Sequence, residues 1–306
     1  MGTNSTRLLV ADVDGGCVEP VHRESRVTGM GRGLETSGQL AGDAIERVIG
    51  AVGDYLAIAS DHGATETAAF ATSAVRDASN GDAFLAELRE RFSLGARVID
   101  GLEEARLTYR GALSDCDDDG PERQTLVVDI GGGSTELIVG TGPVPDFHTS
   151  LQLGVVRHSE RHVHADPPRT EELEALSRDV GTTIDGELAA NPGLRAERAI
   201  AVAGTPATLA AVELGLERFD PATVEGHDLS LESVQQSCSR LASLPLAERQ
   251  AVAGVDPDRA PTIVAGIVIL IKAMRAFGLS RVEVSERDIL YGSALELAEH
   301  ARSASV

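Results

Sequence analysis

The sequence predicts an α/β protein of two domains, from three observations. A chain of 306 residues is long for one compact core and is comfortable for two domains of about 100–200 residues each. Short apolar segments rich in β-branched residues alternate with helical patterns along the chain. This alternation breaks at residues 114–122, SDCDDDGPE, where charge, glycine and proline indicate a surface loop. We therefore predict domains over 1–117 and 118–286, with a C-terminal helix over 287–306 that packs back on the first domain.

In the first domain the patterns predict strands and helices in turn. The helix over 37–55 places leucine, isoleucine and valine on one face. The expected elements are strand 6–13, helix 37–55, strand 68–72, helix 82–92, strand 97–99 and helix 103–113.

The second domain restarts with a hairpin. Its first strand is rich in β-branched residues and its returning strand follows a glycine-rich turn. The expected elements are strands 124–130 and 137–140, helix 171–190, strand 199–203 and helices 231–241 and 262–277. The run over 263–271 is about half of what a bilayer crossing needs, so helix 262–277 is predicted to be a buried helix.

Composition excludes several classes of protein. Of 27 basic residues only Lys272 is a lysine, so a Walker P-loop, which needs one, is absent. The three cysteines form no CxxC pair that could hold zinc. The formal net charge of −21 repels polyanions at long range. It does not exclude a local channel lined by arginine. Without a signal-peptide pattern the chain is predicted to be cytoplasmic, with no membrane or nucleic-acid partner.

Two glycine-led hydroxyl turns carry the chemistry. One is Gly2-Thr3-Asn4-Ser5-Thr6, and the other is Asp129-Ile130-Gly131-Gly132-Gly133-Ser134-Thr135-Glu136. Glycine lets backbone approach an anion closely, while successive N–H groups and Ser, Thr or Asn side chains donate to phosphate oxygens. Each turn alone is equally well explained as a plain β-turn. Two copies, one opening each half, predict two lobes that clamp one phosphate chain.

Several segments in order resemble one known family. GTNSTRLLVADV and VVDIGGGSTELIVG look like the two phosphate motifs of the exopolyphosphatase and guanosine-pentaphosphate phosphatase family. Between and after them stand ATSAVRDA (71–78), IDGLEEARL (99–107), AGTPATL (203–209) and VSERDILYG (284–292), which resemble further family segments. The resemblance implies the short, two-domain type. It also implies two ribonuclease-H-like domains of the actin-like ATPase superfamily with a cleft between them.

The resemblance also implies roles for single residues. Glu104 matches the water-activating glutamate, and Asp129 and Glu136 flank the second turn as ligands of Mg²⁺ or Mn²⁺. Gly204 and Thr205 match a segment opposite the cleft. The implied phosphate-binding residues are Gly2, Thr3, Asn4, Ser5, Arg76, Gly131, Gly132, Gly133, Ser134 and Thr135.

Simpler roles stand beside these. Glu103 and Glu104 fit helix first-turn acids that interact with the dipole. Arg76 fits a surface arginine paired with Asp77, and Asp129 fits a turn-forming aspartate. His158 and His162 are interpreted as surface or hinge histidines rather than metal ligands, because no cysteine or carboxylate cage stands near them in the sequence.

The predicted function is metal-dependent release of terminal phosphate from inorganic polyphosphate, with guanosine pentaphosphate as the alternative substrate of a stringent-response enzyme. With 3% aromatic residues, platforms for a base are scarce, which favours polyphosphate. An actin-fold ATP-binding or regulatory protein and an inactive phosphate-binding scaffold are the other hypotheses. A homodimer is compatible with the resemblance.

The chain departs from the family at one point. A strand ending in aspartate normally precedes the first turn, whereas this sequence begins at Met1. We expect a form extended upstream to be more stable and more active than this one.

Overall fold

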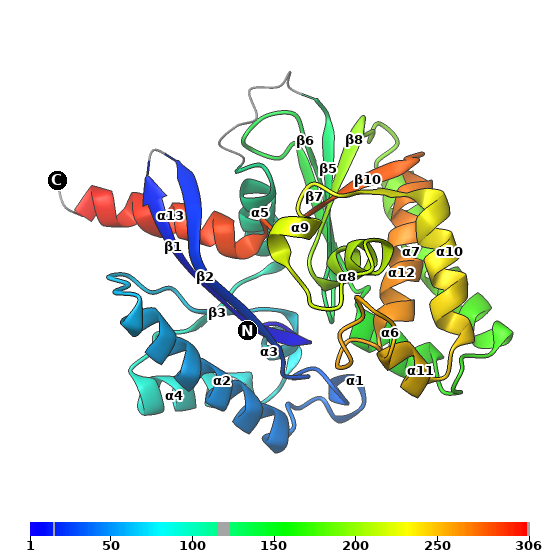
Figure 1. The fold of residues 1–306 in the computed structure, drawn as a ribbon. Coiled ribbons are helices and arrows are strands. Elements are labelled where there is room, and N and C mark those ends of the chain that lie inside the picture. Colours follow the sequence, from blue (N-terminus) through cyan, green and yellow to red (C-terminus); the bar gives the residue numbers. More distant parts are fainter. Residues whose placement is uncertain (15, 115–122, 305–306) are drawn as a thin grey trace. The chain divides into compact units, whose positions relative to one another are not determined.

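A computed structural model describes residues 1–14, 16–114 and 123–304, which form two compact units (Figure 1). Unit 1 comprises residues 1–120 and 287–306, and unit 2 comprises residues 121–286. The boundary predicted at 117/118 and most of the loop predicted over 114–122 lie outside the described residues.

Unit 1 contains two small sheets and the helices around them. β1 and β2 form an antiparallel hairpin, and β3 pairs with β4 in parallel. The elements are β1 (Ser5–Asp14), β2 (Cys17–Val27), α1 (Leu34–Ser37), α2 (Gly42–Asp61), β3 (Phe70–Ala71), α3 (Ser73–Asp77), α4 (Gly81–Phe92), β4 (Arg97–Val98), α5 (Gly101–Ala112) and α13 (Ile289–Ala304).

The helix predicted over 37–55 begins later and ends later than expected. Gly38 adopts φ 67°, a left-handed conformation that ends the short α1 at Ser37. α2 then starts at Gly42 and continues to Asp61. β2 has no counterpart among the predicted elements, because it carries Pro20 and a run of charged residues on a half-exposed strand.

The C-terminal helix α13 packs against α5 of the same unit. A Cβ added to Gly111 would lie 1.9 Å from the carbonyl oxygen of Asp288, and one added to Gly292 would lie 1.9 Å from that of Leu107. The two helices therefore approach so closely that only glycine fits at both positions. The buried Asp288 carboxylate also forms an ion pair with the guanidinium of Arg7 on β1. The guanidinium of Arg23 on β2 lies 3.6 Å from the same carboxylate.

Unit 2 is a six-stranded mixed sheet with helices packed on it. The strand order is β7-β6-β5-β8-β10-β9, with β5, β8 and β10 parallel to one another. The elements are β5 (Thr125–Ile130), β6 (Thr135–Gly140), β7 (Phe147–Leu151), α6 (Val155–His162), α7 (Thr170–Ala190), β8 (Arg198–Val202), α8 (Gly204–Glu213), α9 (Pro221–Val224), β9 (Asp228–Ser230), α10 (Leu231–Ser243), α11 (Leu246–Gln250), α12 (Ile263–Ala276) and β10 (Arg281–Ser285).

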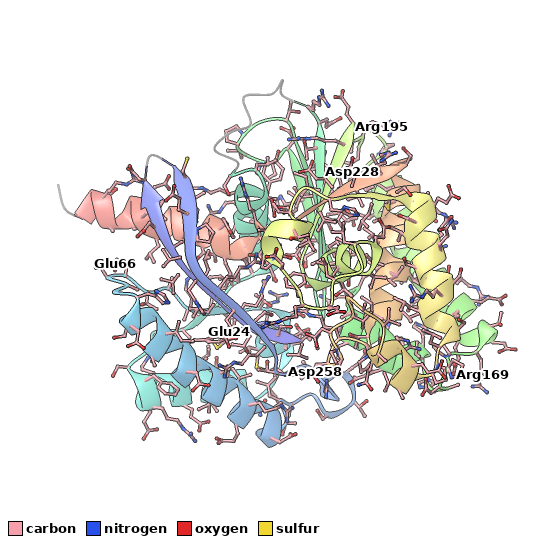
Figure 2. All side chains as sticks on the ribbon, viewed as in Figure 1. Glu24, Glu66, Arg169, Arg195, Asp228 and Asp258 are labelled. Carbon is pink, nitrogen blue, oxygen red and sulfur yellow. The ribbon has the colours of Figure 1, made fainter. Side chains whose placement is uncertain are left out.

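The core of unit 2 confirms the predicted hairpin and the predicted buried helix. β5 and β6 pair antiparallel and all their residues are buried. α12 is buried along most of its length and contacts α6, α7, α8 and α10. Charged side chains such as Arg169, Arg195 and Asp258 lie at the exposed surface of the unit (Figure 2). Among the described residues, no helix combines the length and the apolar character that a membrane span requires.

The buried Glu172 carboxylate holds the segment before α7. It accepts from the N–H groups of His164, Ala165 and Arg169 at 2.9–3.4 Å and from the Arg169 guanidinium. The backbone N–H of Arg169 is the first cause that lowers the pKa of Glu172, from an ordinary 4.5 to about 2.

The hydrogen bonds to Glu172 predict a contribution to the stability of the fold that is lost at acidic pH. A carboxyl with a depressed pKa stabilises the fold fully above its unfolded value of 4.5, and the stabilisation disappears as the pH falls toward about 2. Glu172→Gln is therefore expected to lower the melting temperature at neutral pH, and the difference from wild type is expected to shrink through this window. Glu174→Gln, exposed on the same helix, serves as the control. A difference that stays constant with pH would contradict the prediction.

Candidate active site

The glycine turn of unit 2 joins β5 to β6 and is closed by one hydrogen bond. The Gly131 N–H donates to the Ser134 carbonyl at 2.9 Å. Among the described residues we find no acceptor for the N–H groups of Gly132, Gly133 and Ser134. Successive unpaired amides of this kind can donate to an anion.

The carbonyl groups of the same turn point to the start of α6. Val155 N–H donates to Gly131 at 3.0 Å, Val156 N–H donates to Gly132 at 2.9 Å, and Arg157 Nε donates to Gly133 at 3.0 Å. These three donors hold the carbonyl oxygens of the turn, which would otherwise repel a phosphate. The turn is thus oriented by α6.

The first turn, in unit 1, has the same construction. Gly2 N–H donates to the Ser5 carbonyl at 2.9 Å, as Gly131 does to Ser134. The Thr3 carbonyl accepts from Gly31 N–H at 2.7 Å, and the Asn4 carbonyl accepts from the N–H groups of residues 28 and 29 at 3.0 and 2.8 Å. The N–H groups of Thr3 and Asn4 have no acceptor among the described residues.

A glycine from the supporting segment packs against each turn. A Cβ on Gly154, just before α6, would lie 2.3 Å from the Gly132 oxygen, and one on Gly31 would lie 2.1 Å from Thr3 Cγ2. Both distances are shorter than any real Cβ contact. Neither glycine was predicted as a functional residue.

Two carboxylates stand side by side at the base of the second turn. Asp129 and Glu136 are directly opposed on antiparallel β5 and β6, so their side chains project to one face of the sheet. Both are buried, at 6% and 1% exposure. Ser150 Oγ donates to Glu136 Oε1 at 2.7 Å. Two like charges this close favour a cation, and carboxylate oxygens are ligands that Mg²⁺ prefers.

The second turn differs from expectation at Thr135. This residue belongs to β6, is fully buried, and its hydroxyl donates to the Leu153 carbonyl at 2.6 Å. Because this hydroxyl is used inside the fold, Thr135 supports the turn rather than offering its side chain to phosphate. Likewise the N–H groups of Gly2 and Gly131 close their turns and are not presented outward.

Gly204 and Thr205 begin α8, immediately after β8. Asp129 is paired with Val202 at the end of β8, so Gly204 follows the same edge of the sheet. The Arg259 guanidinium lies against Gly204, where an added Cβ would be 1.6 Å from a guanidinium nitrogen. Thr205 is buried against Gly266 of α12, which also meets Val155.

Glu104 lies in the first turn of α5 in unit 1. Its side chain is largely buried, and Oε2 is 3.5 Å from Arg76 Nη1, which also donates to the Ile99 carbonyl at 2.8 Å. Arg76 is thus paired with Glu104, and Asp77 instead accepts from Ser73. The Met1 carbonyl accepts from Thr72 N–H at 3.2 Å, which places the first turn beside the start of α3.

The neighbouring Glu103 has a different environment. It forms a two-pronged ion pair with Arg97 at 2.5 and 2.7 Å on the exposed side of the helix. Its backbone N–H donates to the Asp100 side chain, which caps α5. Glu103 fits the simple first-turn role, whereas Glu104 faces Arg76.

Two arginines lie near the second turn. Arg157 and Arg259 lie against Gly133 and Gly204, and they supply positive charge locally in a chain with a net charge of −21. Their signal in the sequence is weak, because arginine is the usual basic residue throughout this chain. No group of three or more His, Cys, Asp or Glu that could hold a metal occurs within residues 1–14, 16–114 and 123–304.

Comparison with known proteins decides the family. The model of the Ppx/GppA phosphatase family matches residues 9–300. The chain belongs to the Ppx/GppA phosphatase family. It is 35% identical over 310 residues to exopolyphosphatase 2 of Mycobacterium tuberculosis, covering 97% of this chain and 96% of that protein. Family membership makes it a phosphoanhydride hydrolase.

Solved structures of Ppx/GppA proteins share the fold. An exopolyphosphatase-like protein is 31% identical with a TM-score of 0.90, covering 96% of this chain and 94% of the other. The Ppx/GppA protein of Aquifex aeolicus is 27% identical with a TM-score of 0.81, covering 98% and 96%. An exopolyphosphatase of Cytophaga hutchinsonii is 27% identical with a TM-score of 0.87, covering 97% and 96%. The predicted α/β fold class is therefore confirmed.

Proposed function

We propose that this Ppx/GppA protein is a metal-dependent exopolyphosphatase, which releases terminal phosphate from inorganic polyphosphate. The observation that carries the proposal is the repeated turn. Both units hold a four-residue turn closed by a first-to-fourth hydrogen bond, with its inner N–H groups unpaired among the described residues. The curated relative of similar length bears the name exopolyphosphatase 2.

The turns serve to bind phosphate oxygens. In unit 2 the amides of Gly132, Gly133 and Ser134 donate to them, and in unit 1 those of Thr3 and Asn4 do so, together with the hydroxyl and amide side chains of these turns. A polyphosphate chain presents many equivalent oxygens. Amide and hydroxyl donors that recognise negatively charged oxygens, without a specific group to fit, therefore suit this substrate.

Asp129 and Glu136 would hold Mg²⁺ or Mn²⁺. Their shared face, their burial and the Ser150 bond that orients Glu136 fit a divalent cation with oxygen ligands. When bound, the metal supplies positive charge that offsets the charge of the phosphoryl oxygens.

Glu104 is the proposed general base. Its carboxylate takes a proton from the attacking water, the water oxygen bonds to the terminal phosphorus, and the anhydride P–O bond breaks. The leaving group is polyphosphate shortened by one unit. Arg76, 3.5 Å from Glu104, supplies positive charge beside the carboxylate and fits the phosphoryl oxygens.

The environment of the aromatic residues favours polyphosphate over guanosine pentaphosphate. All three tyrosines, Tyr55, Tyr109 and Tyr291, are buried, so none offers a face for stacking on a base. Phe219 is the one exposed large aromatic side chain among the described residues, and it follows α8 on the 214–220 segment. A substrate without a nucleobase needs no such platform.

Parallel assays test the proposal. Phosphate release is measured from long-chain polyphosphate, guanosine pentaphosphate and ATP, with and without Mg²⁺ or Mn²⁺. We expect the highest kcat/KM for polyphosphate. Higher kcat/KM for guanosine pentaphosphate would select the alternative substrate, and release from ATP alone would reject both.

Asp129→Asn tests the metal site. Removing one carboxylate ligand is expected to raise the Mg²⁺ concentration for half-maximal activity by at least about 10–100-fold, the loss that removal of a residue outside the coordination shell already causes. The fold is expected to persist, because asparagine has nearly the same shape. Asp146→Asn, at an exposed position of the same unit, is the control and should leave the Mg²⁺ titration unchanged. Identical titrations for wild type and Asp129→Asn would remove Asp129 from the metal site.

A further inference from the structure

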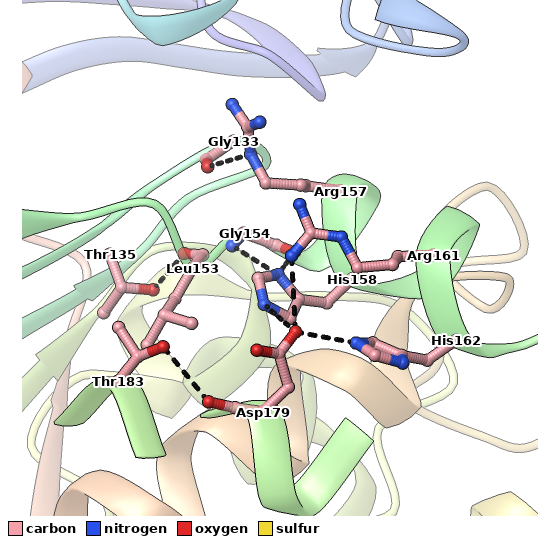
Figure 3. Close-up of polar contacts among 10 residues, drawn as sticks. All are labelled: Gly133, Thr135, Leu153, Gly154, Arg157, His158, Arg161, His162, Asp179 and Thr183. Carbon is pink, nitrogen blue, oxygen red and sulfur yellow. Dashed lines mark hydrogen bonds and ion pairs between the residues drawn. The ribbon is translucent and has the colours of Figure 1, made fainter. Parts of the chain in front are cut away.

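His158 of α6, interpreted from the sequence as a surface or hinge residue, is buried. His158 is 1% exposed, and its imidazole lies between the start of its own helix and Asp179 of α7 (Figure 3). Its Nδ1 is 3.2 Å from Gly154 N, and its Nε2 is 3.6 Å from Asp179 Oδ2. The same carboxylate oxygen is 2.8 Å from His162 Nε2 and 3.3 Å from Arg161 Nη1.

His158 Nδ1 lies 3.2 Å from both the nitrogen and the carbonyl oxygen of Gly154, so the tautomer decides whether it accepts from the N–H or donates to the carbonyl. The Gly154 N–H is a buried donor that needs an acceptor, and His158 Nδ1 provides it when this nitrogen carries no proton. In the tautomer that accepts from the Gly154 N–H, the ring proton is on Nε2, which makes no hydrogen bond among the described residues but lies 3.6 Å from Asp179 Oδ2, an electrostatic contact. The other tautomer would set a nitrogen lone pair against that carboxylate, which is repulsive. Burial, as the largest cause, lowers the pKa of His158 and keeps the ring neutral.

Gly154 connects the His158–Asp179 pair to the glycine turn. It is the N-cap of α6, and its successors Val155 and Val156 donate to the carbonyls of Gly131 and Gly132. It also packs so closely on Gly132 that a Cβ there would be 2.3 Å from the oxygen. A change in the position of Gly154 therefore moves the turn.

We propose that His158 is a positioning residue, which fixes Gly154 through Nδ1, is itself oriented by Asp179, and thereby holds the glycine turn in its phosphate-binding form. As a statement about catalysis, this rests on the proposed function. The chain of contacts runs from Asp179 to His158, to Gly154, and through the first amides of α6 to the turn. His158 touches no reacting group and acts through the backbone.

The other contacts of Asp179 support its role in orienting His158. Its carboxylate is held by His162 and Arg161 as well, and its backbone carbonyl accepts from Thr183 Oγ1 at 3.1 Å. Burial acts to raise the pKa of Asp179, but the hydrogen bonds from His162 and Arg161 outweigh it and lower the pKa. Asp179 is therefore a carboxylate anchor for the ring of His158.

Three variants separate positioning from mere packing. His158→Asn keeps an acceptor near Nδ1, His158→Leu keeps bulk but removes both polar groups, and Asp179→Asn removes the anchoring charge. His300→Leu, at an exposed position of α13, is the control for loss of a histidine. Amide hydrogen exchange of Gly131 and of residues 154–157, whose N–H groups are hydrogen-bonded, is measured without substrate, beside the melting temperature and the kcat/KM for polyphosphate.

We expect His158→Leu to exchange faster at Gly131 and over 154–157 and to lose about tenfold in kcat/KM, the effect of one buried hydrogen bond. His158→Asn is expected to remain near wild type, and Asp179→Asn to lie between the two. If His158→Leu does not fold, the comparison of Asp179→Asn with wild type decides.

Unchanged exchange in both His158→Leu and Asp179→Asn would overturn the proposal, as would equal losses in the asparagine and leucine variants of His158. If the wild type releases no phosphate from polyphosphate, the proposed function fails, while the exchange results still decide the role of His158.

Discussion

Glu104→Gln is expected to lower kcat for polyphosphate by about 10²–10⁴-fold, the usual contribution of a general base. Glutamine keeps the shape of the side chain but cannot take the proton of the attacking water. Its place beside Arg76, at 3.5 Å in the wild type, needs no rearrangement of α5. The melting temperature should therefore stay close to that of the wild type. Steady-state phosphate release and thermal unfolding measure the two quantities.

The adjacent glutamate provides a matched control. Glu103 precedes Glu104 in the same helical turn, but its carboxylate pairs with Arg97 on the exposed side. Exposed ion pairs contribute about 0–1 kcal/mol, so Glu103→Gln should change neither kcat nor stability much. Equal activity in Glu104→Gln and wild type would remove Glu104 as the base. Equal losses in both variants would indicate a general effect on α5.

Gly154→Ala is expected to reduce kcat/KM by about 100-fold, because displacement of a binding group by about 1 Å has an effect of this size. The added methyl would lie 2.3 Å from the Gly132 oxygen and 2.4 Å from the Gly133 carbonyl carbon. Both atoms are backbone, so the turn or the start of α6 must move. Overpacking of this kind also destabilises the fold by about 1–3 kcal/mol.

Gly186→Ala is the control for this substitution. Gly186 lies inside α7, and an added Cβ would meet no heavy atom within 4 Å. Alanine in a helix interior is favoured over glycine by about 0.5–1 kcal/mol, so this variant should be slightly more stable and fully active. Wild-type activity in Gly154→Ala, measured beside Gly186→Ala, would show that the turn tolerates the displacement.

Elements with strong periodicity could be predicted from the sequence, whereas elements decided by packing could not. The helices α4, α7 and α12 and the β5–β6 hairpin lie within a few residues of their predicted ranges, since their apolar patterns face a core. β2 was missed, because a half-exposed strand carries no clear alternation. The helix predicted over 37–55 starts too early, because the left-handed Gly38 looks like any helix glycine in the sequence, and α1 has no predicted counterpart.

The residues of the candidate site likewise fall into those that local sequence indicates and those that only packing decides. The glycine turns could be identified from local sequence, whereas the roles of Asp129, Glu136 and Glu104 come from the family resemblance and stay predictions. Thr135 was assigned to phosphate on its position beside Ser134, yet its hydroxyl is used by Leu153, eighteen residues away. The sequence indicates a surface or hinge role for His158, because nothing local shows that Asp179 and Gly154 lie against its ring.

The sequence by itself determined that this protein has α/β domains, two glycine-led turns and the ordered motifs of a phosphatase family. These properties reside in short segments, where residue type and spacing act directly on the backbone. Only the tertiary structure decided which groups orient the turns, namely Gly31 with the amides of 28 and 29 in unit 1, and Gly154 with α6 in unit 2. Those contacts join segments that are distant along the chain, and packing of the whole unit is what brings them together.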